Sequence, residues 1–301
     1  MKLSDFFKQN VICDGGFETL GKLASRPDCS MLTFLNSSKY LPALYDNPAV
    51  SCIICTQEVA DMLAPEKSYG IVISCAPQAD FYSLHNSLVY NAEYAGAKFD
   101  TVIGKNCTIS PLACIAPQNV KIGDNVIIEE FVSIKEGTLI GDDCVIRSGS
   151  VLGAEGLEFS NNNGNIIHVI HTGKAILGNR VEVQHNSVIG RAVLPHDNTT
   201  IGNDSKIDSL VAVGHNATIG KRVIISSYSS VGGGCIIEDD VCIAPCSCIK
   251  NRCIVHRNAH VTLGSVVVQN VNEGQTVTGN FATDHAEFLN NMLSLKRLHR
   301  K

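Results

Sequence analysis

Large aliphatic side chains recur every six residues over the second half of this chain. From Leu177 to Val267 the first position of each hexad holds Leu, Ile or Val, and only Pro195 breaks this rule. The fifth position of each hexad holds Val, Ala, Ser, Thr or Cys, and never a large side chain. In a triangular coil the large residue fills the centre and the small one fits the corner, so this pattern predicts a parallel β-helix.

A shorter series of hexads precedes this one. It begins near Ile103, slips by one residue at Lys121 and resumes from Ile122 to Leu152. The period then fails over residues 153–176, which contain the turn-forming run SNNNGN. A long loop inside a regular solenoid is usually functional or disordered, so we predict an excursion there. We therefore expect a left-handed parallel β-helix over residues 101–272, an exception to the usual crossover hand.

The two ends of the chain lack the hexad. Residues 1–100 contain three strand-like runs, at 31–35, 50–55 and 69–74, and a stretch with helical spacing at 78–95, so we predict a small α/β domain. Residues 273–301 form a tail in which 283–301 reads as a helix capped by Thr283 or Asp284.

The composition of the chain argues against several classes of protein. The net charge of −5 argues against nucleic acid as a partner. The 13 cysteines follow no secretory pattern, and the pair Cys52–Cys55 lies in an apolar run with no second pair, so we expect reduced thiols. The N-terminus does not resemble a secretory signal and no segment is long enough to span a bilayer, which predicts a cytoplasmic protein.

One histidine stands out from the coil geometry. In a regular coil of 18 residues, Gly233 lies one coil above His215, within the run Gly232–Gly234. An outward imidazole beside a backbone without side chains suits acyl transfer, because the imidazole can accept a proton and a backbone N–H can stabilise an oxyanion. The alternative is a solvated turn histidine beside a glycine corner. A zinc site needs clustered histidines, and His185 falls on another face than His215, so we predict no metal.

Three segments carry a resemblance to a known family. LASRPDCSMLTFLNSSKY (23–40), VLGAEGLEF (151–159) and VAVGHNATIG (211–220) are similar to segments of the UDP-3-O-acylglucosamine N-acyltransferases of lipid A synthesis. In that family the second segment reads Gly-Ala-Asp-Gly-Phe-Gly and the third contains the catalytic Ile-Ala-His-Asn. The order of an α/β domain, a hexad solenoid with one excursion and a C-terminal helix is also similar.

The resemblance implies catalytic roles. His215 matches the general base that deprotonates the sugar amine, Asp208 matches an acidic residue that orients or charge-balances it, and Gly233 matches the backbone oxyanion donor. It also implies a homotrimer with active sites between neighbouring solenoids, and a donor whose acyl group is carried on phosphopantetheine, either acyl carrier protein or CoA. No bound cofactor is expected.

The resemblance also implies substrate contacts. Phe34 and Tyr40 match aromatic residues that hold the uracil, Ser37 stands where the family has an asparagine that contacts uridine, and Asn216 and His171 complete the predicted set. His171 is included because it lies on the excursion, which can fold over a ligand.

The chain departs from the family at several points. Leu157-Glu158-Phe159 replaces Gly-Phe-Gly, and the C-terminal helical segment is short. Its basic end, Lys296, Arg297, Arg300 and Lys301, can still meet an acidic carrier protein. Another nucleotide-linked amino sugar of a surface glycan is therefore an alternative acceptor.

The sequence leaves two further hypotheses open. One is an acetyl-CoA-dependent acetyltransferase acting on an amine or hydroxyl of a sugar. The other is a solenoid that binds a sugar or acts as a scaffold without catalysis.

Overall fold

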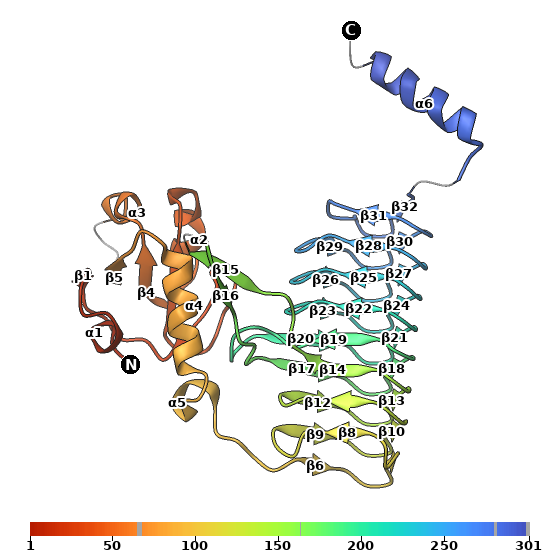
Figure 1. The fold of residues 1–301 in the computed structure, drawn as a ribbon, viewed down its shortest axis with the longest axis horizontal. Coiled ribbons are helices and arrows are strands. Elements are labelled where there is room, and N and C mark those ends of the chain that lie inside the picture. The colour runs from red at the N-terminus through yellow and green to blue at the C-terminus, as the bar shows by residue number, and fades with distance from the viewer. Residues whose placement is uncertain (65–67, 163, 280–281, 299–301) are drawn as a thin grey trace.

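An α/β unit, a three-sided β-helix and a separate C-terminal helix make up the chain (Figure 1). The computed structural model describes residues 1–64, 68–162, 164–279 and 282–298. The α/β unit lies to one side of the β-helix, level in this view with its middle and upper coils, and the C-terminal helix extends beyond the last coil.

The α/β unit is built on a five-stranded sheet in the order β1-β5-β4-β3-β2, parallel except for β1. The three predicted strands are present as β3, β4 and β5, whereas the predicted single helix is split in two where Asn91 caps α5. The elements are α1 (Leu3–Phe6), β1 (Val11–Cys13), β2 (Thr19–Leu20), β3 (Met31–Leu35), the 3-10 helix η1 (Ser38–Tyr40), α2 (Leu41–Tyr45), β4 (Val50–Cys55), α3 (Gln57–Asp61), β5 (Gly70–Ile73), α4 (Pro77–Leu88) and α5 (Ala92–Ala95).

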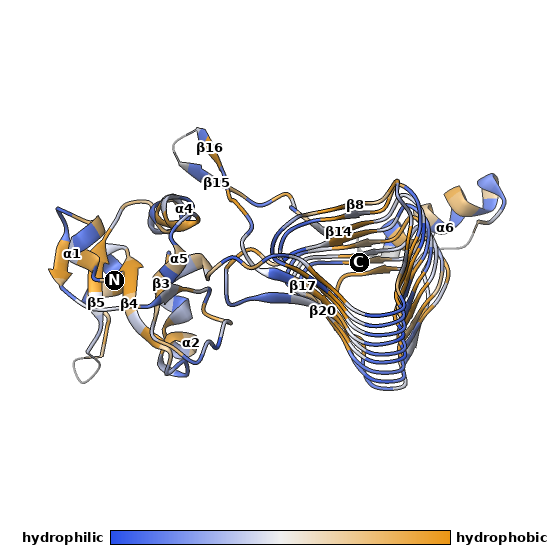
Figure 2. Cartoon of the chain, turned by 90° about the horizontal axis from the view of Figure 1, so that it is seen from below, coloured by the Kyte–Doolittle hydropathy of each residue, from blue (hydrophilic) through white to orange (hydrophobic). Residues whose placement is uncertain are grey.

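Three parallel sheets form the sides of the prism, which has a triangular outline when it is viewed along its axis (Figure 2). The first contains β7 (Thr108–Ile109), β10 (Ile127–Ile128), β13 (Val145–Ile146), β18 (Glu182–Val183), β21 (Lys206–Ile207), β24 (Ile224–Ile225), β27 (Cys242–Ile243), β30 (His260–Val261) and β32 (Thr276–Val277). The second contains β8 (Cys114–Ile115), β11 (Ser133–Ile134), β14 (Val151–Ala154), β19 (Val188–Gly190), β22 (Ala212–Val213), β25 (Ser230–Val231), β28 (Cys248–Ile249) and β31 (Val266–Val267). The third contains β6 (Val102–Ile103), β9 (Val120–Ile122), β12 (Thr138–Ile140), β17 (Lys174–Leu177), β20 (Asn198–Ile201), β23 (Thr218–Ile219), β26 (Ile236–Ile237) and β29 (Ile254–Val255).

The strand register confirms the 18-residue coil and corrects it at one place. Ile201 pairs with Ile219 and Ile219 with Ile237, as expected for three hexads per turn. Leu177, however, pairs with Ile201, which is 24 residues later. The hexad that contains Pro195 therefore leaves the coil, so the repeat is not continuous from Leu177 onward, and residues 191–197 form a second excursion. Proline has no N–H to donate to a strand ladder, which explains why this hexad cannot stay in the sheet.

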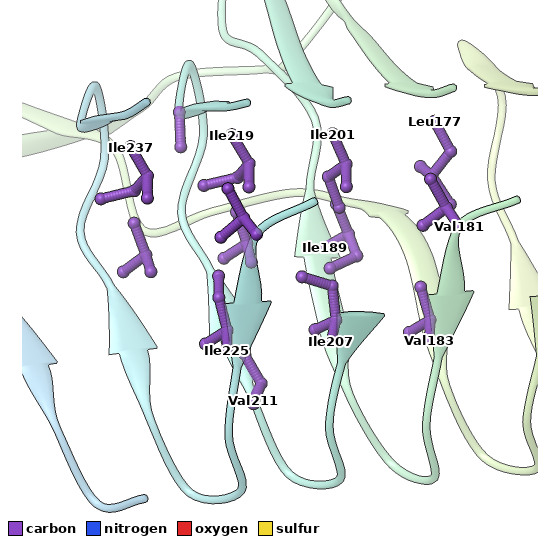
Figure 3. Close-up of a cluster of buried hydrophobic side chains, with 14 of the residues drawn as sticks. Leu177, Val181, Val183, Ile189, Ile201, Ile207, Val211, Ile219, Ile225 and Ile237 are labelled. Carbon is purple, nitrogen blue, oxygen red and sulfur yellow. The ribbon is translucent and has the colours of Figure 1, made fainter. Parts of the chain in front are cut away.

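The hexad side chains meet along the axis of the prism. Val183, Ile207 and Ile225 are fully buried in one continuous apolar cluster, and their side chains stack from coil to coil (Figure 3). The small fifth positions fill the corners as predicted. Several of them carry a hydroxyl that donates to a carbonyl, as Ser187 Oγ does to Asp208 O and Ser205 Oγ to Gly220 O. These hydroxyl groups are therefore buried with their hydrogen bonds formed.

The predicted excursion, which is the first of the two along the chain, contains a hairpin formed by β15 (Phe159–Asn162) and β16 (Asn165–His168). At the other end of the chain, α6 (His285–Leu298) begins after Asp284, whose carboxylate accepts hydrogen bonds from the backbone N–H groups of Ala286 and Glu287. Of the predicted basic end, Lys296 and Arg297 lie in α6, and Arg300 and Lys301 lie outside the described residues. Among the helices that the structure describes, none is long and apolar enough to cross a bilayer.

Candidate functional site

His215 lies at the corner of the prism from which both excursions leave. It follows β22, and the register places the end of β19 one coil below and the end of β14 two coils below. Each of those two strands is followed by an excursion. Val169 from the first excursion, and Val193 and Leu194 from the second, are buried in one cluster with the apolar face of the α/β unit. The site is therefore built where the two parts of the chain meet.

Two side chains and one backbone N–H group fix the orientation of the His215 ring. His215 Nδ1 lies 3.1 Å from Asn216 Oδ1. The same amide oxygen accepts from the Val193 N–H at 3.2 Å, while Asn216 Nδ2 donates to Asp197 Oδ2 at 2.9 Å. Because Asn216 Oδ1 is only an acceptor, Nδ1 of the neutral ring carries the proton. The lone pair that can take a proton from a substrate is therefore on Nε2.

The acidic residue of this network comes from the second excursion. Asp197 accepts from Asn216 on one oxygen and from Ser25 Oγ of the α/β unit at 2.9 Å on the other. The sequence reasoning missed Asp197, and Pro195 was the signal for the excursion that carries it. Both ends of the Asn216 amide form hydrogen bonds within this network, and the predicted contact of Asn216 with substrate stays a prediction.

A carboxylate faces the Nε2 atom of His215. Glu158 Oε2 lies 3.4 Å from Nε2, and both side chains are largely buried, with exposed fractions of 19% and 18%. The other oxygen, Oε1, accepts from Lys22 Nζ and from Tyr82 Oη, each at 2.8 Å. Burial alone would raise the pKa of Glu158, but Lys22, Tyr82 and His215 outweigh it and lower that pKa. The side chain is therefore an anion at neutral pH.

Glu158, Lys22 and Tyr82 were not assigned roles by the sequence. Glu158 lies in the predicted excursion at a point where the chain departs from the family pattern, which was the signal available. Nothing in the hexad spacing shows that this loop folds back over His215.

His171 lies behind His215 as a buried neutral ring. The two rings meet edge to face with their centres 5.7 Å apart. Its Nδ1 donates to Val169 O at 3.0 Å and its Nε2 accepts from the Gly156 N–H at 3.2 Å. Burial lowers the pKa of His171 to about 4. Both ring nitrogens therefore have hydrogen-bond partners, and His171 is 2% exposed. In this structure the ring supports the loop that carries Gly156 and Val169. The predicted contact of His171 with substrate stays a prediction.

Acidification from pH 7 to pH 5 is expected to destabilise the protein through His171. The unfolded state takes up a proton near pH 6.5, whereas the folded state resists it down to about pH 4. Stability from this group is therefore complete above pH 6.5 and is lost as the pH falls, by about 2 kcal/mol at pH 5. Urea denaturation at both pH values should show that His171→Gln, which hydrogen-bonds without titrating, loses about 2 kcal/mol less than the wild type. An equal loss in both proteins would contradict this assignment.

Gly233 lies against the imidazole, as the coil spacing predicted. A Cβ atom at Gly233 would stand 2.8 Å from His215 Nε2 and 2.9 Å from Cε1. The predicted oxyanion donor, however, is occupied in this structure, because the Gly233 N–H donates to Asn251 Oδ1 at 3.1 Å. The neighbouring Gly232 and Gly234 N–H groups bond to the carbonyls of Ile249 and His215. What Gly233 supplies here is the space in which the ring lies.

Asp208 lies at a different corner of the prism. It follows β21 of the first sheet, whereas His215 follows β22 of the second. Its carboxylate accepts from Ser227 Oγ and from the backbone N–H groups of Ser227 and Ser209. The Ser227 hydroxyl is the main reason why the pKa of Asp208 is lowered. Within one chain Asp208 therefore does not orient His215, and a pairing with the His215 of another copy stays a prediction.

The predicted base-binding residues lie in the α/β unit. Phe34 packs in an aromatic cluster, with its ring centre 5.0 Å from that of Phe81 and 6.1 Å from that of Tyr82. Because Tyr82 bonds to Glu158, this cluster adjoins the site. Ser37 precedes η1, and Tyr40 ends it with an exposed ring that lies 4.9 Å from Lys39 Nζ. Their contact with a nucleotide stays a prediction.

A cavity of about 490 Å³ opens behind His171, between the segment 89–99 and the lower coils. His171 and Glu155 line it, together with Arg191, whose Nε donates to Gly173 O. In the part of the chain that the structure describes, no three His, Cys, Asp or Glu side chains are grouped to hold a metal ion.

The fold and the repeats define a class of protein. The family description "Bacterial transferase hexapeptide (six repeats)" matches residues 119–154 and 198–233. A UDP-N-acetylglucosamine acyltransferase from Bacteroides fragilis 9343 superposes with a TM-score of 0.50 at 25% identity, over 57% of this chain and 64% of that one. The chain is thus a hexapeptide-repeat protein with a left-handed β-helix.

The chain is also similar in sequence to named enzymes. UDP-3-O-acylglucosamine N-acyltransferase of Coxiella burnetii (strain Dugway 5J108-111) is 27% identical over 208 residues, which cover 60% of this chain and 58% of the relative. The enzyme of the same name from Polynucleobacter asymbioticus is 35% identical over 100 residues, covering 32% of this chain and 28% of the relative. The chain therefore spans between about a quarter and three fifths of the length of these relatives. Over these parts of its length the chain is similar to hexapeptide acyltransferases.

Proposed function

We propose that this protein transfers an acyl group from a carrier thioester to the amine of a nucleotide-linked amino sugar, with His215 as general base. The observation that carries the proposal is the orientation of the imidazole, with Nδ1 bonded to Asn216 and the lone pair of Nε2 directed toward Glu158 and Gly233. A base held in one tautomer, with little exposure to solvent, suits proton removal from an attacking nucleophile.

The chemistry needs three events at one place. His215 Nε2 takes a proton from the nucleophile, and Asp197 stabilises the resulting imidazolium through Asn216. The amine attacks the thioester carbonyl, the C–N bond forms and the C–S bond breaks. The Gly233 N–H is the proposed oxyanion donor, and it becomes free when the exposed Asn251 side chain turns away.

The names of the relatives support a UDP-linked sugar amine as the acceptor. We assign nucleotide binding to the region of Phe34 and Tyr40, where flat rings suit a base. The donor is a thioester of phosphopantetheine, carried by acyl carrier protein or by CoA. The active unit is proposed to be a homotrimer, since exposed Ile224, Ile236 and Val266 point outward from the three sheets and need apolar cover.

The test is a matrix of acceptors and donors. UDP-, dTDP- and GDP-linked amino sugars are each incubated with acyl carrier protein thioesters of several chain lengths or with acetyl-CoA. Product is detected by mass, because exposed free cysteines of the chain itself, such as Cys13 and Cys246, would react with thiol reagents. Amide formation from a carrier thioester is the expected result. Transfer from acetyl-CoA alone identifies the acetyltransferase alternative, and a nucleotide-dependent rise in melting temperature without any product identifies a binding protein.

A further inference from the structure

Glu158 has one oxygen that its protein partners leave for a ligand. Oε1 is doubly bound, by Lys22 Nζ and Tyr82 Oη. Across the described residues, the contact recorded for Oε2 is the one at 3.4 Å with His215 Nε2, the atom that holds the lone pair. When the His215 ring is neutral, two acceptors therefore face each other with no hydrogen between them. Buried acceptors in this arrangement need a donor.

A primary ammonium group beside this pair can donate to both acceptors at once. It carries three N–H donors and a positive charge, so one N–H can bond to Oε2 while another bonds to Nε2. A sugar hydroxyl has one hydrogen and no charge, and it can satisfy only one of the two. The pair formed by Glu158 and His215 can therefore bind a cationic amine more tightly than a hydroxyl.

We propose that Glu158 binds the acceptor as its protonated primary amine and so selects N-acylation over O-acylation; this rests on the acyl transfer proposed above. The ammonium gives one proton to His215 Nε2, and Glu158 stabilises the imidazolium that results. The neutral amine attacks the thioester carbonyl, and the C–S bond breaks as the imidazolium protonates the leaving sulfur. The nitrogen then loses its second proton to His215, which releases it to solvent. Of the three ammonium protons, one stays on the amide, one leaves on the thiol and one passes to water.

The test compares an amino-sugar nucleotide with the matching nucleotide sugar that has a hydroxyl in place of the amine. The ratio of kcat/KM for amine over hydroxyl is measured for the wild type, Glu158→Gln and Glu158→Met. Any effect common to both acceptors, such as altered access to His215 or a looser contact with Lys22, cancels in this ratio. We expect the ratio to fall by about tenfold to a hundredfold in both variants, mainly through a higher KM for the amine.

A matched control lies three residues earlier on the same loop. Glu155 is exposed and lies 3.8 Å from His168, so Glu155→Gln should keep the wild-type ratio. An unchanged ratio in both Glu158 variants would overturn the proposal and leave Glu158 as a contact between loop and α/β unit. Calorimetric Kd values for the two acceptors without donor give an independent reading. If the wild type forms no product, these Kd values still test ammonium binding, so the two proposals fail separately.

Discussion

Replacing His215 by alanine is expected to lower turnover by about a hundredfold or more and to leave the β-helix folded. The loss follows because general-base catalysis by a positioned side chain contributes about two to four orders of magnitude. The fold is expected to survive because the ring lies outside the prism core, which is formed by other side chains of the hexads. The check is kcat with the amine acceptor, together with far-UV circular dichroism and the hydrodynamic size.

A graded control comes from the network behind the ring. Asp197→Ala removes the carboxylate that bonds to Asn216 Nδ2 but keeps the imidazole, so its turnover should lie between that of the wild type and that of His215→Ala. A fully active His215→Ala protein would remove this histidine from the mechanism. An Asp197→Ala protein with wild-type turnover would show that the tautomer does not depend on this contact.

Adding one methyl group at Gly233 is expected to lower turnover by about a hundredfold with little change in stability. The new Cβ atom would stand 2.8 Å from His215 Nε2, closer than two such atoms can approach. The ring is the end of a movable side chain, so it is displaced while the backbone stays. A shift of about 1 Å in a catalytic group can cost about two orders of magnitude in rate.

Gly16→Ala is the matched control for this prediction. A Cβ atom there would have Met1 O as its nearest neighbour, at 3.8 Å, which is an ordinary contact. Gly16→Ala should keep wild-type turnover and Gly233→Ala should not, while the two melting temperatures stay within a few degrees of the wild type. Wild-type turnover in Gly233→Ala would show that the ring does not need the space that this glycine leaves.

The hexad pattern was sufficient to predict the solenoid, but it did not predict one of the loops that leave it. Large residues at the first position and small ones at the fifth can be buried together only in a triangular coil, which is why Ile219 stacks on Ile201 as expected. The excursion at 191–197 lengthens its coil from 18 to 24 residues, which is one hexad more, so it preserves the period while leaving the coil. Only Pro195 marked it, and the strand register was needed to show that the chain departs there.

The order of residues along the chain determined the prism, its axial core, and the position of His215 beneath Gly233, because each of these depends on spacing within a repeat. The tertiary structure alone decided which groups surround the imidazole. Lys22, Glu158, Asp197 and His215 come from four separate segments, and they meet because two loops fold back onto the α/β unit. No repeat in the sequence encodes such contacts, because they depend on how buried apolar side chains such as Val169 and Leu194 pack against a domain that is distant in sequence.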